Sequence, residues 1–307
     1  MIKKKVTPYR VMSVVILVIL ALLFLFPLYW IITGAFKTTA DIYAPKPQFF
    51  PQEFTWNNFE RLFAKRTAPA WELTVPFSAQ FSANHQPIVF STGPTIPAAF
   101  RWLFNTVFMA VMAMVLTCIT ASMAGYALAK KRFRGRALLF SLIVCAMALP
   151  KQVILIPLIK EISAMNMWND IWAVILPTVG WPFGVFLMKQ FYEGVPSELC
   201  EAARIDGLTE YGIWFRIMLP LSKPALSTLT IFTFVSTWND FLGPLIYLTK
   251  NELKTIQIGL RMFISQYSAE YGLIMAASVI ALIPVLIVFL SLQKYFVQGV
   301  ASTGIKG

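Results

Sequence analysis

The sequence predicts an all-α membrane protein with six transmembrane helices. Hydrophobic residues make up 58% of its 307 residues and charged residues only 13%, and its mean hydropathy is +0.68. Soluble domains are closer to half apolar and about a quarter charged. The apolar residues also gather into runs of about 20 residues, the length that a helix needs to cross a bilayer. Composition and run length therefore favour a membrane protein before any motif is considered.

The first apolar run begins after the basic stretch 3–10 and extends from Val11 to about Ile32. A signal peptide has a similar basic start, but its apolar core is usually only about 7–15 residues long. We therefore expect an uncleaved first span. Five further spans are expected near residues 100–129, 137–159, 168–192, 225–248 and 272–296. In the second span, Thr117, Ala121 and Gly125 recur every four residues, a pattern that lets helices approach closely in lipid.

The basic residues predict which side of the membrane is cytoplasmic. Short loops carry most of the topological signal, and cytoplasmic loops are rich in Lys and Arg. The loop 130–136, between the second and third spans, contains Lys130, Lys131, Arg132, Arg134 and Arg136. We therefore expect this loop and both termini in the cytoplasm. The net charge of +12 lies in such clusters beside apolar runs, so it does not predict a nucleic-acid partner.

The first external segment, residues 37–99, contains a polar and proline-rich stretch at 66–98. Polar and apolar positions alternate along this stretch, which favours short strands or an extended hairpin. It could contact a binding protein or a partner subunit. It could equally be an insertion that an exposed loop tolerates.

The polar interruption between the fourth and fifth apolar runs predicts a short helix from Ser197 to Gly207. Ser197 is a typical N-cap, and Glu198 and Glu201 lie in the first turn, where the helix dipole favours anions. Gly207 is expected to end the helix in the left-handed conformation. Leu219 and Pro220 then lead the chain back into an apolar run.

The spacing within this interruption resembles a known sequence motif. Glu201-Ala202-Ala203 is followed after three residues by Gly207 and after nine more by Ile217-x-Leu219-Pro220. This spacing resembles the cytoplasmic EAA loop of bacterial ABC importer permeases. The flanking segments 196–199, 222–226 and 238–240 extend the resemblance, and residues 298–307 resemble the tail of the smaller permease in maltose-type carbohydrate importers. The resemblance covers about Phe100 to Gly307; the stretch 66–98 departs from the family pattern.

The resemblance implies a type I ABC importer fold with a cytoplasmic coupling helix that docks on an ATPase. The regions are then residues 1–36 with the first span, the loop 37–99, the core 100–296 with its EAA loop 197–226, and the tail 297–307. The implied coupling residues are Glu198, Glu201, Ala202, Ala203, Asp206, Gly207, Leu219 and Pro220. The implied ATPase-contacting residues of the tail are Gly299, Gly304, Lys306 and Gly307.

The resemblance also implies the partners and the cargo. The partners are a second permease of the MalF type, two ATP-binding cassette subunits that carry ATP and Mg²⁺, and an extracytoplasmic solute-binding protein, all at the inner membrane. The cargo is a carbohydrate, and an oligosaccharide in particular. A glycerol-phosphate or another polar organic solute is the alternative.

Two charges, Lys151 and Asp240, fall inside the third and fifth predicted spans. At about 1.5 Å of rise per residue, both would lie in the outer half of the bilayer, where opposite charges can pair. With Trp238 and Asn239 they are candidates for the translocation path. Alternatively, kinks at Pro150 and Pro244 place both charges at the outer interface as anchors. Two such charges are few for the relay of an ion-coupled secondary transporter, which is the less favoured class.

The sequence does not predict an enzyme. It contains no G-x-x-x-x-G-K-[ST] loop, so the chain is not expected to bind or hydrolyse ATP. His85 is the single histidine, and no metal-ligand spacing or catalytic set can be built from it. We therefore expect no catalytic residue, no metal and no cofactor on this chain.

Overall fold

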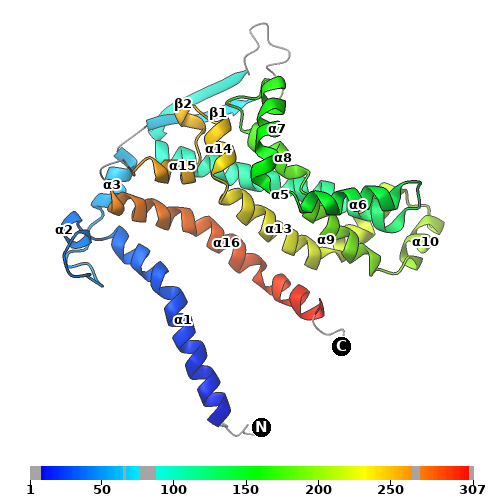
Figure 1. Ribbon diagram of the computed structural model, residues 1–307, viewed down its shortest axis with the longest axis horizontal. Helices are drawn as coiled ribbons and strands as arrows, with labels where there is room; N and C mark the ends of the chain where they lie inside the picture. Colours follow the sequence, from blue (N-terminus) through cyan, green and yellow to red (C-terminus); the bar gives the residue numbers. More distant parts are fainter. Residues whose placement is uncertain (1–7, 65–66, 76–87, 265–269, 304–307) are drawn as a thin grey trace. The chain divides into compact units, whose positions relative to one another are not determined.

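The computed structural model describes residues 8–64, 67–75, 88–264 and 270–303. The chain forms two compact units, one of Met1–Thr67 with Leu260–Ile283 and the other of Ala68–Gly259 with Pro284–Gly307. Figure 1 labels the principal helices and strands. The elements of the first part of the chain are α1 (Pro8–Ala35), α2 (Thr39–Ile42), α3 (Asn57–Ala64), β1 (Thr67–Thr74), β2 (Val89–Pro97) and α5 (Ala98–Lys130).

The later elements are mostly short helices. They are α6 (Arg136–Met147), α7 (Lys151–Ala164), α8 (Trp172–Val179), α9 (Pro182–Glu193), α10 (Glu198–Ile205), α11 (Glu210–Ile213), the π-helical η1 (Trp214–Met218), α12 (Leu219–Leu221), α13 (Lys223–Trp238), α14 (Leu242–Tyr247), the 3-10 helix η2 (Asn251–Leu253), α15 (Ile256–Arg261) and α16 (Tyr271–Thr303).

Among the described residues, four segments are long and apolar enough to cross a membrane without a sharp bend. They are α1, α5, the segment Trp172–Glu193 and the segment Tyr271–Ser291. Two further segments pass the same test as bent pairs: α6 with α7, bent by 107°, and Glu210–Leu221 with α13, bent by 81°. The six predicted spans are thus reached when each bent pair counts as one. In the second pair, the predicted span 225–248 starts within α13, so Glu210–Leu221 belongs to the polar connection before it.

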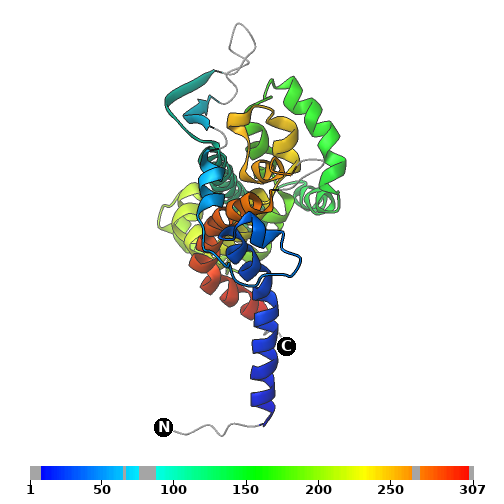
Figure 2. The same ribbon diagram turned by 90° about the vertical axis from the view of Figure 1, so that its left-hand side faces the viewer.

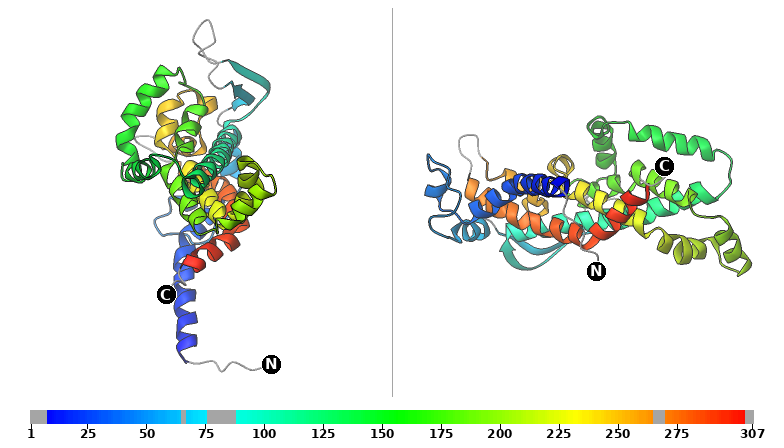
Figure 3. Two further views of the ribbon diagram at one scale, coloured as in Figure 1. Left: turned by 90° about the vertical axis from the view of Figure 1, so that its right-hand side faces the viewer. Right: turned by 90° about the horizontal axis from the view of Figure 1, so that it is seen from below.

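The third predicted span, 137–159, is not a straight helix. It is divided into α6 and α7, and the sharp corner between them is visible in the right-hand view of Figure 3. Pro150 lies at the corner; it lacks an N–H group and disfavours helical geometry at the preceding residue. The predicted depth of Lys151 assumed a straight helix, so that estimate does not hold.

Helix α5 is the centre of the second unit. It packs against α8, α9 and α13. Thr117, Ala121 and Gly125 are all buried, as their spacing predicted. A Cβ atom on Gly125 would lie 2.7 Å from the Cβ of Met188 and 2.8 Å from the backbone N of Lys189, so only glycine permits the observed approach of α5 to α9.

Side chains at the start of α5 form hydrogen bonds with the backbone of the segment after α14. The Trp102 indole donates to the carbonyl of Asn251 at 2.8 Å, and the Asn105 amide donates to the carbonyls of Glu252 at 2.7 Å and Lys254 at 3.0 Å. The Thr106 hydroxyl accepts from the Ile256 N–H at 2.9 Å. Because Trp102, Asn105 and Thr106 are buried, this segment is fixed to α5 although it lies far along the chain.

The predicted strands within 66–98 are present. β1 and β2 form a two-stranded sheet, and Figure 2 shows them side by side. The N–H of Val75 donates to the carbonyl of Ile88 at 3.0 Å. Residues 76–87, including His85, lie outside the described residues.

The first unit is organised around the end of α1 and the start of α16. The Asn58 amide donates to the carbonyls of Ala35 and Lys37 at 3.0 and 2.8 Å. Phe36 stacks on Phe54 at 4.6 Å between ring centroids. The most apolar window of α1 is entirely unburied, which suits a helix that faces lipid or another subunit.

Candidate functional site

The helix predicted at Ser197–Gly207 is α10, and its C-terminal end follows the sequence signal. Gly207 has φ +80°. The Leu208 N–H donates to the carbonyl of Ala203 and the Gly207 N–H to that of Arg204, both at 3.0 Å. This pair of bonds is the Schellman arrangement that ends many helices at a left-handed glycine.

The N-terminal end of α10 differs from the prediction. Ser197 occupies the N-cap position but makes no capping hydrogen bond, and its φ and ψ of −73° and −22° are helical. A side-chain cap requires extended backbone at this position. The Ser197 hydroxyl instead accepts from Lys130 Nζ at 3.4 Å, and Lys130 also donates to the carbonyl of Val195. The end of α5 thus holds the entry to α10.

α10 has one buried side and one exposed side. Cys200 and Ala203 are buried in an apolar cluster with Ile213 and Met218, and the sulfur atoms of Cys200 and Met218 are 3.8 Å apart. The exposed side, called here the α10 face, consists of Glu198, Leu199, Glu201, Ala202, Ile205 and Asp206. The adjacent alanines of the EAA triplet therefore have different surroundings: Ala203 contacts the chain's own core and Ala202 is accessible.

The apolar members of this region are unusually accessible. Ile205 is 88% exposed and Leu199 is 44% exposed, and the nearby Tyr211 and Phe215 are 73% and 62% exposed. All four lie in the polar connection between α9 and α13, whose predicted location is outside the bilayer. An accessible group of large apolar side chains with acidic neighbours is typical of a protein-binding surface.

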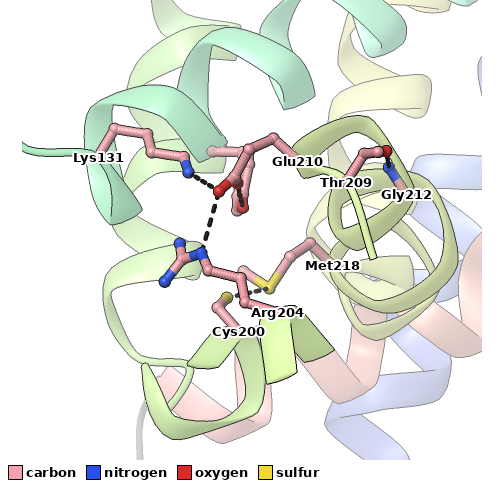
Figure 4. Close-up of polar contacts among 8 residues, drawn as sticks. Lys131, Cys200, Arg204, Thr209, Glu210, Gly212 and Met218 are labelled. Carbon is pink, nitrogen blue, oxygen red and sulfur yellow. Dashed lines mark hydrogen bonds and ion pairs between the residues drawn. The ribbon is translucent and has the colours of Figure 1, made fainter. Parts of the chain in front are cut away.

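A polar network that the sequence did not predict is centred on Glu210. Thr209 caps α11 by accepting from the Gly212 N–H at 3.3 Å, which places Glu210 in the first turn. Its carboxylate accepts from Arg204 Nε at 3.0 Å, from the Tyr126 hydroxyl at 2.7 Å and from Lys131 Nζ. Figure 4 shows Lys131 and Arg204 pointing to this carboxylate from different parts of the chain.

These donors keep Glu210 ionised. The hydrogen bond from Lys131 above all, with those from Tyr126 and Arg204, lowers the pKa of Glu210 to about 2 although partial burial opposes the shift. A lowered carboxylate pKa means that the network is complete above the ordinary pKa of Glu and is lost only as the pH falls toward about 2. The Glu210 carboxylate is therefore ionised near neutral pH.

The remaining EAA-loop residues lead into α13. The π-helical turn Trp214–Met218 precedes Leu219, which is half-buried, and Pro220, which is exposed. π-helical turns are rare and often mark functional sites. Ser222 then fixes the start of α13, because its buried hydroxyl lies 3.0 Å from the Tyr192 hydroxyl of α9.

The four candidates for a translocation path have mostly local partners in the structure, and their place in that path stays a prediction. Lys151 and Asp240 make no ion pair; Lys151 Nζ donates to the Ser236 hydroxyl at 3.1 Å and lies 5.9 Å from the centroid of the Trp181 ring. Asp240 accepts from the Gly243 N–H at 3.4 Å, in the break between α13 and α14. Asp240 is still near enough to Lys151 for an electrostatic interaction, but the direct hydrogen-bond partner of Lys151 is the serine one turn earlier on α13.

The two neighbours of Asp240 also have local partners. Trp238 is only 2% exposed and stacks on Phe234 at 5.4 Å between ring centroids, so within this chain it is a core residue. The exposed Asn239 amide donates to the carbonyl of Val235 at 3.0 Å. Neither side chain makes a polar contact with Lys151 among the described residues.

The predicted tail lies only partly within the described residues. α16 continues to Thr303, so Gly299 belongs to a helix, whereas Gly304, Lys306 and Gly307 fall outside the described part of the chain. In that described part, no group of three or more His, Cys, Asp or Glu side chains is placed to hold a metal ion.

Comparisons with known proteins give a consistent result. Residues 121–302 match the family described as "Binding-protein-dependent transport system inner membrane component". The chain is 34% identical over 301 residues to an arabinooligosaccharides transport system permease protein of Bacillus subtilis, covering 97% of this chain and 96% of that protein. It is 30% identical to a lactose transport system permease protein of Rhizobium radiobacter, covering 92% of each chain.

A solved structure has the same fold. It belongs to a bacterial ABC transporter involved in the import of the acidic polysaccharide alginate, and it aligns with a TM-score of 0.75 at 21% identity, covering 96% of this chain and all of that chain. At this identity the likeness concerns the fold alone. It extends over both units.

Proposed function

The chain belongs to the family of binding-protein-dependent transport system inner membrane components, and from this membership we propose that it is the permease for import of a carbohydrate, an oligosaccharide in particular. The relatives named for arabinooligosaccharides and lactose support this class of cargo. A second permease of the MalF type completes the pathway, and a solute-binding protein delivers the cargo. Both termini and the EAA loop are cytoplasmic.

The α10 face is the observation that carries the coupling part of this proposal. A helix of eight residues, ended by a left-handed glycine and fixed to its own core by Cys200 and Ala203, presents acidic and apolar side chains outward. Such a rigid projection suits a groove on an ATPase subunit. ATP and Mg²⁺ bind to the two ATPases, whose closure displaces α10 and shifts the permease pair between outward-facing and inward-facing states.

Purification under mild detergent tests the assembly. We expect two ATPase subunits and a second permease to co-purify with this chain, and arabinotriose to stimulate ATP hydrolysis when the associated binding protein is added. A chain that purifies alone as a homo-oligomer and transports without ATP would contradict the proposal. Stimulation by glycerol-3-phosphate but not by oligosaccharides would retain the importer and change its cargo.

A further inference from the structure

We propose that Glu210 is a positioning residue through which displacement of α10 is passed to the membrane helix α5. The inference rests on the proposed function, in which an ATPase moves α10, and it adds the route by which that movement enters the spans. Glu210 itself contacts neither ATP nor cargo in this account. It acts through Arg204 on one side and through Lys131 and Tyr126 on the other.

The first step of the argument is where the three donors come from. Arg204 belongs to the last turn of α10, Tyr126 belongs to the last turns of α5, and Lys131 is the residue that follows α5. The Glu210 carboxylate therefore joins two helices that are far apart in the sequence. Hydrogen bonds are directional, unlike the apolar contacts beneath α10, so the carboxylate fixes the orientation of α10 relative to α5 and not merely their proximity.

The second step is that the end of α5 contacts the chain both directly before and shortly after α10. Lys130 holds the entry to α10 through Val195 and Ser197, and Lys131 holds its exit through Glu210. Consecutive residues of one helix end thus contact the segments that directly precede and follow α10, and Glu210 joins the second of these contacts to Arg204 of α10. A rigid displacement of α10 must either move the end of α5 or break these bonds.

The third step is that α5 can carry the movement onward. At Gly125, the residue directly before Tyr126, α5 is in close contact with the backbone of α9, and it also packs on α13. Packed helices of this kind shift as units because close-packed interiors do not deform continuously.

The fourth step separates a positioning role from a purely stabilising one. The Glu210 and Lys131 side chains are 44% and 31% exposed, and exposed ion pairs contribute little to stability. The buried cluster that includes Cys200 and Ala203 holds α10 in place without the carboxylate. Loss of the Glu210 charge should therefore leave α10 folded and able to bind the ATPase while it weakens the transfer of movement.

Hydrogen exchange of the detergent-purified complete transporter tests this directly. The exchange of the α10 segment and of residues 126–136 is compared with no nucleotide and with ATP trapped by vanadate. In the wild type we expect trapping to change exchange in both segments by about threefold or more. In Glu210→Gln we expect the change in α10 to persist and the change at 126–136 to fall below about half of the wild-type value. Lys131→Met should have the same effect.

Glu193→Gln is the matched control. Glu193 has an exposed carboxylate (37%) that pairs at 2.7 Å with Lys189 of the same helix, so its loss should leave both responses intact. A full response at 126–136 in Glu210→Gln would overturn the proposal, as would loss of the ATPase subunits from that variant. If α10 of the wild type does not respond to trapping, the proposed function fails together with this inference.

Discussion

Two glycines in the described chain occupy the left-handed region. Comparing the same substitution at both distinguishes the effect of backbone strain in general from the effect of strain at the end of α10. Gly207 has φ +80° and Gly135 has φ +82°. No heavy atom lies within 4 Å of the Cβ that a substitution would add at either position. A side chain at these positions therefore introduces conformational strain without a steric clash.

Gly207→Val should weaken coupling to the ATPases. A β-branched residue in the left-handed region costs about 1–2 kcal/mol, and the strain is relieved if the end of α10 turns out of its Schellman geometry. We expect normal membrane insertion with reduced ATPase attachment or reduced stimulated hydrolysis, measured on the purified complex. Gly135→Val carries the same strain between α5 and α6 and should have the smaller effect on coupling. Equal effects of the two variants would show that general strain is responsible.

Lys151 should be coupled energetically to Ser236 more strongly than to Asp240. The hydrogen bond at 3.1 Å joins Lys151 to Ser236, whereas no ion pair joins it to Asp240. Residues in direct contact show coupling energies of about 0.5–3 kcal/mol. Uptake rates of Lys151→Met, Ser236→Ala, Asp240→Asn and the corresponding double variants give both couplings. If exchange of the charges, Lys151→Asp with Asp240→Lys, restores uptake, the carboxylate is the true partner.

At the scale of the elements, helix ends were predictable where the signal is local. Gly207 ends α10 as the sequence indicated, because a left-handed C-cap depends on one residue and its immediate neighbours. The strands around 66–98 followed from alternation and proline content. The prediction of Ser197 as a side-chain cap was wrong. Its hydroxyl accepts a hydrogen bond from Lys130, which lies too far away in the sequence to be recognised as a partner.

The division of the third span into two helices was not predicted, although the sequence contains a local signal for it. Leu149-Pro150 occurs at the corner between α6 and α7, and a proline there was interpreted as a kink within a continuous helix. Hydrophobicity alone does not distinguish a straight span from two helices bent by 107°, because both bury the same apolar residues in lipid.

Two truncations of the chain distinguish the contribution of the helical part of the predicted tail from that of residues 304–307. We expect truncation after Val297 to alter basal ATP hydrolysis or its coupling to uptake, with assembly retained, because it removes both residues 298–303 of α16 and residues 304–307. Truncation after Thr303 keeps the helix and removes only 304–307. If both truncated complexes hydrolyse ATP at unchanged basal and stimulated rates, the tail does not contact the ATPases.

At the scale of the whole molecule, the class of protein was predictable and the long-range polar contacts were not. Composition and the Glu201–Pro220 spacing are sufficient to indicate the family. The Glu210 network was not found, although Thr209-Glu210 after Gly207 is a typical helix start. Its partner Tyr126 is 84 residues away, and nothing in a single sequence indicates which hydroxyl or ammonium group will reach a given carboxylate.

The orientation of the chain in the membrane is the last prediction, and it depends on charge alone. Arg132 and Arg134 are exposed in the short loop between α5 and α6, and short basic loops remain cytoplasmic. In a variant without native cysteines, Arg134→Cys should react with an impermeant maleimide only after spheroplasts are permeabilised. Glu53→Cys, at an exposed position in the predicted external segment, should react in intact spheroplasts. The reverse labelling pattern would invert the topology and place α10 on the wrong side for an ATPase.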